Sequence, residues 1–189
     1  MTTTSTETGI QGYEAATWNI DPVHSEVGFS VRHMMVSKVR GKFNTFSGQI
    51  VTGENPLQSS ATAEIELASI DTNNEQRDNH IRSSDFFEVE THKTMTYRST
   101  GVRVEDGEYI LDGELTLKGV TKNVPLNLEL NGFAPDPFGG TRAGFSARGE
   151  ITRSDFGVNF GLGEGGGIMV SDKVSLQLEI EAVLEKNEG

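Results

Sequence analysis

Apolar and polar residues alternate with a period of two over most of the chain from Trp18 onward. Side chains of a β-strand point alternately to its two faces, so this pattern indicates strands with one buried and one solvent-facing side. One wet face is typical of antiparallel sheets, and the chain is therefore predicted to form about eight antiparallel strands. The alternating runs occupy residues 27–33, 39–50, 61–67, 95–102, 109–117, 124–130, 143–151 and 174–184.

Turn signals separate these runs. Asp106-Gly107 stands between two alternating runs and predicts a tight hairpin. Further turns are predicted at Asn55-Pro56, at residues 119–123 and at Asp136-Pro137.

In two runs the alternation changes phase. One slip lies between Phe43 and Phe46, and the other lies between Tyr97 and Val102, beside Gly101. A β-bulge produces such a slip and bends its strand. Both slips are therefore predicted to be bulges that help the sheet to close into a barrel.

One segment lacks the strand pattern. Residues 72–75 read Thr-Asn-Asn-Glu, the spacing of a capping box with Thr72 as the N-cap and Glu75 at the third helical position. A short helix is predicted from residue 73 to about residue 83. Residues 1–13 are small and polar and are predicted to form a disordered tail. Residues 14–186 are predicted to form a single domain, because no repeat or linker interrupts them.

Composition narrows the function classes. The chain has 189 residues, enough for one domain with a hydrophobic core, and a net charge of -12. An acidic surface repels phosphate backbones, so nucleic acid is not expected as a partner. The N-terminal residues lack the basic and apolar parts of a signal peptide, and no run approaches the ~20 apolar residues of a membrane helix. We therefore expect a cytoplasmic protein without stable membrane insertion.

Asp21, His24 and Ser25 are the residue types of a catalytic triad. His24 and Ser25 are neighbours, so on a strand their side chains would point to opposite faces, out of the mutual reach that a nucleophile and its base need. The favoured interpretation is structural: Asp21 and Pro22 form a turn, and Ser25 satisfies nearby backbone groups. Catalysis is not expected at this position.

Metal and nucleotide sites also lack clear signals. The chain has no cysteine, and His24, His33, His80 and His92 do not have the short spacings of structural zinc motifs. Residues 161–167 read GLGEGGG and contain the spacing of a dinucleotide fingerprint, but the next regular segment is a strand and not the helix that this fingerprint requires. We expect a plain flexible loop there, with the border of a ligand mouth as the less favoured alternative, and neither a metal nor a cofactor.

Several positions on the apolar phase carry very small side chains. A packed core would have large side chains there, whereas an eight-stranded barrel that is left unfilled can hold one small ligand. Glycine within a strand can also mark the close approach of a ligand. The same residues could instead accommodate bulges or helix packing, and the pattern leaves both interpretations open. The positions are Ala61, Ala63, Gly113, Ala143, Ala147 and Gly149.

A set of motifs runs in order through residues 14–184. They are WNIDPVHS at 18–25, VGFSVRH at 27–33, GKF at 41–43, FSG at 46–48, IDT at 70–72, RD at 77–78, DFF at 85–87, GELTLKGVTK at 113–122, RA at 142–143, RSDFG at 153–157 and VSDKV at 170–174. In these motifs the chain resembles the YceI-like family of lipocalin-like, polyisoprenoid-binding bacterial proteins.

This resemblance implies an all-β fold: an elongated eight-stranded antiparallel lipocalin-like β-barrel with one short helix packed beside it. It also implies a long isoprenoid tail, of a quinone or a prenyl lipid, enclosed by the barrel. Residues 21–33 would then form a wall and not a catalytic site. A homodimer is predicted from the resemblance and from the apolar segment Met34-Met35-Val36 at the mouth, which a monomer would leave partly exposed.

We therefore predict a non-enzymatic protein that binds a long-chain isoprenoid lipid and carries or stores it, with no ligand other than that lipid. His33, Asp71 and Arg153 lie on the inward phase at strand ends, where they would either contact a polar headgroup or pair with one another. The remaining predicted ligand-binding residues are Phe29, Val31, Phe43, Met95, Tyr97, Gly113, Phe145, Ala147, Leu176 and Leu178.

Two other classes of protein, a barrel enzyme and a protein-binding scaffold, are alternatives to a lipid-binding protein and predict a different barrel interior. A barrel enzyme, such as an isomerase or cyclase acting on a lipophilic substrate, needs a polar cluster deep in the cavity, and the alternation places none there. A scaffold that binds other proteins through a sheet edge predicts a filled barrel.

Overall fold

The computed structural model describes residues 9–34, 36–162 and 170–186. Within these ranges, twelve strands form one antiparallel sheet, accompanied by the helix α2 (Glu75–Arg82) and by the short 3-10 helices η1 (Pro56–Gln58), η2 (Leu67–Ser69) and η3 (Arg153–Phe156). The strands are β1 (Ala16–Ile20), β2 (Glu26–His33), β3 (Ser37–Phe43), β4 (Phe46–Thr52), β5 (Ser60–Glu66), β6 (Ile70–Asp71), β7 (Thr94–Glu105), β8 (Glu108–Leu117), β9 (Val120–Asn123), β10 (Leu126–Pro135), β11 (Thr141–Thr152) and β12 (Val170–Leu184).

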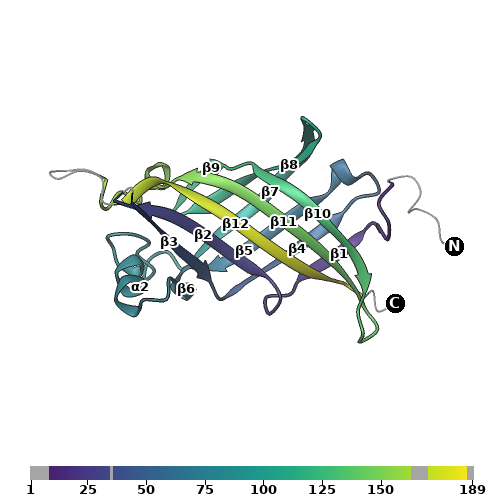
Figure 1. The fold of residues 1–189 in the computed structure, drawn as a ribbon, viewed down its shortest axis with the longest axis horizontal. Helices are drawn as coiled ribbons and strands as arrows, with labels where there is room; N and C mark the ends of the chain where they lie inside the picture. The colour runs from purple at the N-terminus through teal and green to yellow at the C-terminus, as the bar shows by residue number, and fades with distance from the viewer. Residues whose placement is uncertain (1–8, 35, 163–169, 187–189) are drawn as a thin grey trace.

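Eight of the described strands close into an elongated barrel (Figure 1). Their order around the ring is β1, β4, β5, β7, β8, β10, β11 and β12, and the pairing of Trp18 with Leu184 joins β12 back to β1. Helix α2 lies beside one end of the barrel, and β1 lies toward the other end. The predicted fold class, an elongated antiparallel lipocalin-like barrel with one short helix beside it, is confirmed.

The strand count exceeds the predicted one because residues 39–50 form two strands, β3 and β4, and because β1, β6 and β9 lie outside the predicted alternating runs. β1 and β2 both pair with β12, and the turn that starts at Asp21 separates them. β3 ends at Phe43 and β4 begins at Phe46, so the predicted bulge within residues 39–50 is wrong. The chain bends at Asn44-Thr45, whose backbone bonds to Ser69 and Glu66, and both phenylalanines are buried on either side of the bend.

Other local predictions are confirmed. The register of β7 against β8 shifts between Ser99 and Gly101, as the second phase slip predicted. Asp106 and Gly107 both have positive φ, at 52° and 80°, which is the backbone of a type I′ hairpin turn. In the predicted turn at residues 119–123, only Gly119 belongs to the turn, and Val120–Asn123 forms β9.

The predicted N-cap of the helix is wrong. Asn74, and not Thr72, caps α2: its side chain accepts a hydrogen bond from the Arg77 backbone N–H. Asn73 has a φ of 63°, so the chain changes direction after Thr72 and a capping-box geometry cannot form there. Thr72 is instead buried, and its Oγ1 donates to Asp78 Oδ1 at 2.5 Å. The helix therefore begins at Glu75.

The described part of the N-terminal segment contacts the barrel. Residues 1–8 of the predicted tail lie outside the described residues. Tyr13 is 7% exposed, and its hydroxyl donates to the carbonyl oxygen of Gly53 at 2.6 Å. This contact ties residue 13 to the end of β4.

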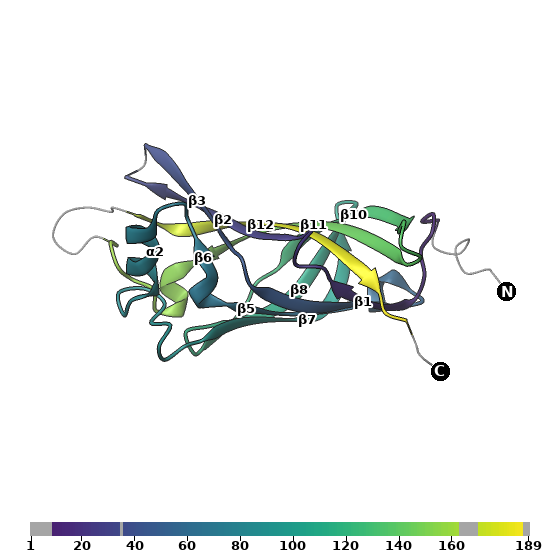
Figure 2. The same cartoon turned by 90° about the horizontal axis from the view of Figure 1, so that it is seen from below.

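Buried side chains form two groups along the barrel. One gathers around Trp18 with Ala143, Phe145 and Ala182, and a larger one extends under α2 and η3 and includes Leu67 and Phe156. Figure 2 shows α2 and β6 toward one end of the barrel and β1 toward the other. Within the described residues, no helix has the length and apolar character needed to cross a membrane.

Candidate functional site: an apolar tunnel

A cavity of about 770 Å³ occupies the barrel interior. Its lining extends from Tyr13, just before β1, to His33 at the end of β2 and Phe160 after η3, so it follows the barrel from one end to the other. The volume lies within the roughly 300–1,000 Å³ of typical ligand pockets. Its walls are mainly aliphatic and aromatic side chains on the inward phase of the strands. The barrel is therefore not a filled core, as the scaffold class would require.

All but two of the predicted ligand-binding residues line this cavity. Strand alternation identifies those that lie on strands, because an inward position on a barrel strand faces the interior. Arg153 instead lies on η3, directly after β11. Their role in binding stays a prediction. The lining residues among them are Phe29, Val31, His33, Phe43, Met95, Tyr97, Phe145, Ala147, Arg153, Leu176 and Leu178.

Asp71 is one of the two exceptions and does not line the cavity. Its carboxylate accepts hydrogen bonds from the Asn73 backbone N–H at 2.9 Å and from Asn44 Nδ2 at 3.2 Å. These bonds, the backbone one first, hold the pKa of the Asp71 carboxyl below its ordinary value. β6 has only two residues, which is too short for alternation to indicate an inward face.

Gly113 is the other exception, and its small size has a different cause from the predicted one. The Tyr97 ring lies over Gly113, so that a Cβ at position 113 would overlap the ring. The Tyr97 hydroxyl donates to the carbonyl oxygen of Val124 at 2.8 Å, and burial raises the pKa of this phenol. Gly113 thus makes room for a neighbouring ring and not for a ligand.

The other small residues divide between the two interpretations. Ala61, Ala63 and Ala147 line the cavity, as residues that leave room for a ligand should. Ala143 instead packs in the group around Trp18. A Cβ at Gly149 would lie 2.6 Å from Leu126 Cδ2, so Gly149 accommodates a side chain of the adjacent strand.

Arg153 is a buried cation at the α2 end of the tunnel. Its guanidinium donates to the carbonyl oxygens of Ser171, Val158 and Val170, at 2.9, 3.0 and 2.8 Å. Burial lowers the pKa of this guanidinium. Among the described residues, no ion pair joins Arg153 to Asp71 or His33, so the interpretation as an internal salt bridge has no support. A guanidinium has five N–H donors. The three hydrogen bonds to backbone carbonyl oxygens use three of the five donors of Arg153.

Sequence reasoning missed an aromatic cluster at the same end of the tunnel. The rings of His80, Phe86 and Phe160 stack edge-on or tilted, with centroids 4.8 to 5.3 Å apart, and all three line the cavity. They come from α2, from the loop after it and from the loop after η3. Strand periodicity is not informative in these segments, so no signal pointed to the cluster.

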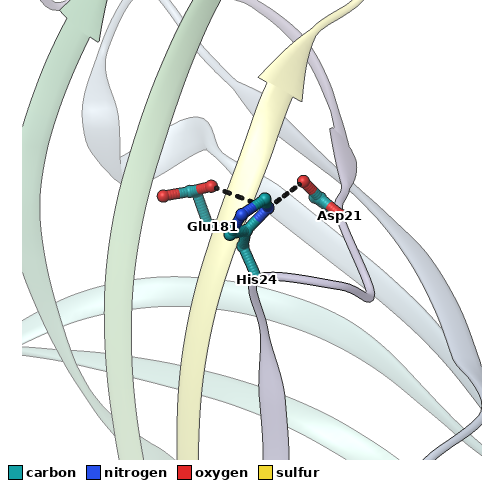
Figure 3. Close-up of side chains that lie close together, drawn as sticks. All are labelled: Asp21, His24 and Glu181. Atoms are coloured by element: carbon teal, nitrogen blue, oxygen red, sulfur yellow. Dashed lines mark hydrogen bonds and ion pairs between the residues drawn. The ribbon is translucent and has the colours of Figure 1, made fainter. Parts of the chain in front are cut away.

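The predicted structural role of the 21–25 segment is confirmed. The Asp21 carboxylate accepts from the Val23 backbone N–H at 2.9 Å, which forms the turn. Ser25 Oγ donates to the carbonyl oxygen of Glu181 at 3.1 Å and accepts from its N–H at 2.9 Å. His24 Nδ1 lies 2.8 Å from Asp21 Oδ2 and 3.6 Å from Glu181 Oε2, as Figure 3 shows. The Ser25 hydroxyl is engaged by backbone, and no triad is assembled.

Three side chains lie close enough together to hold a metal ion: Asp21, His24 and Glu181. Arg142 already supplies a positive charge to both of these carboxylates. Its Nη1 donates to Asp21 at 2.7 Å and to Glu181 at 2.8 Å, and its Nε donates to Asp136 at 2.7 Å. The Arg142 and His24 hydrogen bonds hold the pKa of the Asp21 carboxyl well below its ordinary value. The absence of a metal requirement stays a prediction, which elemental analysis of the dialysed protein would test.

Arg142→Met is expected to reduce the loss of unfolding free energy that the protein shows as the pH falls below about 4. Asp21 and Asp136 both have lowered pKa values in the folded protein, whereas an aspartate in an unfolded chain has a pKa of about 3.9. Such groups stabilise the fold fully above about pH 4, and this stability is lost as the pH falls toward the folded pKa. Urea denaturation across this range should therefore show a steeper acid loss in the wild type than in Arg142→Met. Arg148→Met, which removes an exposed cation on β11, should show the same dependence of stability on pH as the wild type. If the free energy of unfolding fell equally with pH in all three proteins, the proposed effect of Arg142 on the two aspartates would be contradicted.

The closed antiparallel barrel and its apolar tunnel place the protein among the lipocalin-like barrels. The chain belongs to the YceI-like family, since the profile of the YceI-like domain matches residues 18–182. It is 41% identical over 175 residues to the UPF0312 protein plu2095 of Photorhabdus laumondii, a match that covers 91% of this chain and 88% of that protein.

Solved structures share the fold. The Campylobacter jejuni YCEI protein is 31% identical, with a TM-score of 0.72 over 94% of this chain and 100% of that one. A Saccharophagus degradans domain described as polyisoprenoid binding gives a TM-score of 0.68 over 91% of this chain and 100% of its own. It is 18% identical, so its likeness concerns the fold alone.

Proposed function

We propose that this protein binds a long-chain isoprenoid lipid, of the quinone or polyprenyl type, inside the barrel and carries or stores it without catalysis. The observation that carries the proposal is the tunnel, a cavity of about 770 Å³ with mainly apolar walls that extends from one end of the barrel to the other. A long and flexible hydrocarbon chain matches this shape. The polar groups of Arg153 and His33 lie at one end, where a headgroup would be positioned.

Energetics favour exchange over permanent capture. Each CH₂ group removed from water contributes ~0.8 kcal/mol, so a tail of tens of carbons would formally exceed the ~18–21 kcal/mol limit of non-covalent affinity. Ordering the flexible tail offsets part of this gain. The same tail is also stabilised in a bilayer, so transfer between bilayer and tunnel is nearly balanced. A protein that loads and unloads its lipid fits this balance.

A binding role is better supported than an enzymatic one. Among the described residues, the polar side chains of the lining lie mostly toward the ends of the tunnel. In its middle the Tyr97 hydroxyl is occupied by the Val124 carbonyl group. The fold is shared with a protein described as a polyisoprenoid binding domain. An isomerase or cyclase would need free acid and base groups next to the substrate.

Native mass spectrometry of the purified protein, followed by organic extraction, tests the proposal. We expect a complex with one isoprenoid lipid per chain, whose mass is recovered in the extract. Incubating the emptied protein with a long-chain quinone should restore the complex. Recovery of protein that stays empty after this incubation would contradict the proposal, and conversion of the added lipid to a product would favour the enzymatic alternative.

A further inference from the structure

The β2–β3 hairpin has a charge opposite to that of the rest of the protein. Residues 27–53 contain no aspartate or glutamate, although the chain as a whole has a net charge of -12. Four of its 16 basic residues, Arg32, Lys38, Arg40 and Lys42, lie in this hairpin. A cationic segment on an acidic protein indicates a local binding preference that differs from that of the overall surface.

Strand register places these four cations on one face. Arg32 is opposite Lys38, Ser30 is opposite Arg40, and Lys42 follows two residues along the same strand. The side chains between them, Val31 and Val39, point the other way and line the tunnel. All four cations are exposed, and none makes an ion pair with another described residue. The outer face of the hairpin is therefore a basic surface behind the tunnel wall, and Lys38, close to the hairpin tip, also reaches the tunnel lining.

Among the described residues, two carboxylates lie near this surface and offset part of its charge, Asp71 at Lys42 and Asp172 on the neighbouring strand β12. Asp71 lies opposite Lys42 at the base of the hairpin, and its carboxylate also accepts from Asn73 and Asn44. The Asp172 carboxylate accepts from the Ser154 backbone N–H and hydroxyl. More distant acidic groups act weakly, because the Debye length is about 8 Å at physiological ionic strength.

The two described residues on either side of position 35, at the tip of the hairpin, are apolar and exposed. Met34 is 58% exposed and Val36 is 83% exposed. Figure 2 shows the hairpin projecting from the barrel at the end that carries α2. His33, adjacent to the tip, lines the tunnel, so the projecting tip stands beside the tunnel mouth. Apolar side chains flanked by cations are the combination that binds the interface of an anionic bilayer.

We propose that the β2–β3 hairpin docks this protein on the surface of an anionic bilayer, with Met34 and Val36 in the headgroup region and the basic face against the lipid phosphates. This orientation sets the tunnel mouth against the bilayer. Its role, loading the tunnel, rests on the proposed lipid-binding function, whereas the docking itself depends only on the hairpin. A symmetric pairing with a second copy of the chain fits the surface less well, since it would bring four cations against four cations.

Vesicle co-sedimentation tests the docking. Wild-type protein should bind vesicles of phosphatidylcholine mixed with phosphatidylglycerol, bind vesicles of phosphatidylcholine alone only weakly, and dissociate as salt is raised. Each cation near an anionic surface contributes roughly a fivefold gain in binding, so Arg32→Glu/Arg40→Glu should weaken it by about 25-fold or more. Neither residue lines the tunnel. Met34→Ser/Val36→Ser should weaken binding to the same vesicles without removing its salt dependence.

Arg148→Glu/Lys122→Glu is the matched control, since it changes the net charge by the same amount at exposed positions on β11 and β9. It should bind within about twofold of the wild type, because single surface attractions at a distance are screened. Equal losses in the control and the hairpin variant would overturn the proposal, as would wild-type binding that ignores lipid charge. A wild-type dimer that Met34→Ser/Val36→Ser converts to monomers would assign the hairpin to a second copy instead.

Lipid content distinguishes this proposal from the proposed function. Arg32→Glu/Arg40→Glu, loaded from detergent, should retain the isoprenoid that organic extraction recovers from the wild type. A wild type that contains lipid but does not bind anionic vesicles overturns the docking alone. A wild type that binds the vesicles but never takes up an isoprenoid overturns the proposed function and leaves the docking standing.

Discussion

Ala147→Phe is expected to lower the affinity for long isoprenoids by tenfold or more while the barrel stays folded. Ala147 lies on β11, is 6% exposed and lines the tunnel between the flanking strands β10 and β12. A phenyl ring at this position would enter space that the tail is proposed to occupy. Each CH₂ excluded costs ~0.8 kcal/mol, so excluding only two exceeds the 1.4 kcal/mol of a tenfold loss. Isoprenoids short enough to stop before the ring should bind nearly as before.

Ala143→Phe is the matched control for this substitution. Ala143 is also an inward alanine on β11, four residues away, but it is 1% exposed and packs against the group around Trp18. A ring inserted there has no cavity to enter and should cost roughly 1–3 kcal/mol or more by overpacking. Urea denaturation and binding assays on both variants separate the two effects. Equal destabilisation of both, or undiminished binding of long tails by Ala147→Phe, would refute a continuous tunnel at this position.

Trp18→Ala is expected to cause the largest loss of stability, about 3–5 kcal/mol. Trp18 is fully buried, its ring centroid lies 5.3 Å from that of Phe133, and its Nε1 donates to Thr52 Oγ1 at 2.9 Å. Truncation would leave a large void in the group of side chains at this end of the barrel. It would also weaken β1, the strand that pairs with both β4 and β12. Urea denaturation monitored by far-UV circular dichroism measures the loss directly.

Trp18→Phe separates the packing of the ring from its hydrogen bond. Phenylalanine restores most of the apolar contacts but cannot donate to Thr52, so its loss should be clearly smaller than that of alanine. A free-energy loss below about 1 kcal/mol for Trp18→Ala would show that this end of the barrel tolerates a void, contrary to the packing described.

Strand positions and their inward faces could be predicted from the sequence because both follow from a period that is local to each strand. The prediction failed where the chain leaves a strand. At Asn44-Thr45 a bend looks like a bulge in the alternation, since both shift the phase by one residue. At Asn73 a positive φ redirects the chain and transfers the N-cap from Thr72 to Asn74.

Side-chain contacts across the fold could not be predicted in the same way. Gly113 is small because of the Tyr97 ring on the neighbouring strand, and a glycine that hosts a ring is indistinguishable in sequence from one that leaves space. Arg142 and Asp21 are 121 residues apart, and only the closure of the barrel brings them together. The aromatic cluster of His80, Phe86 and Phe160 likewise depends on one helix and two loops that the fold brings together.

The closing pair of strands has a consequence for biosynthesis. β1 leaves the ribosome before the other strands of the barrel, and its partner residues 182–184 on β12 leave it after them. At about 5–20 residues per second, roughly 10 s or more separate the two. During this interval the nascent chain is an open sheet whose unpaired edge and apolar inner face are both accessible to other chains. Closure of the barrel, and with it protection of the apolar inner face from aggregation, must therefore wait until β12 has been synthesised.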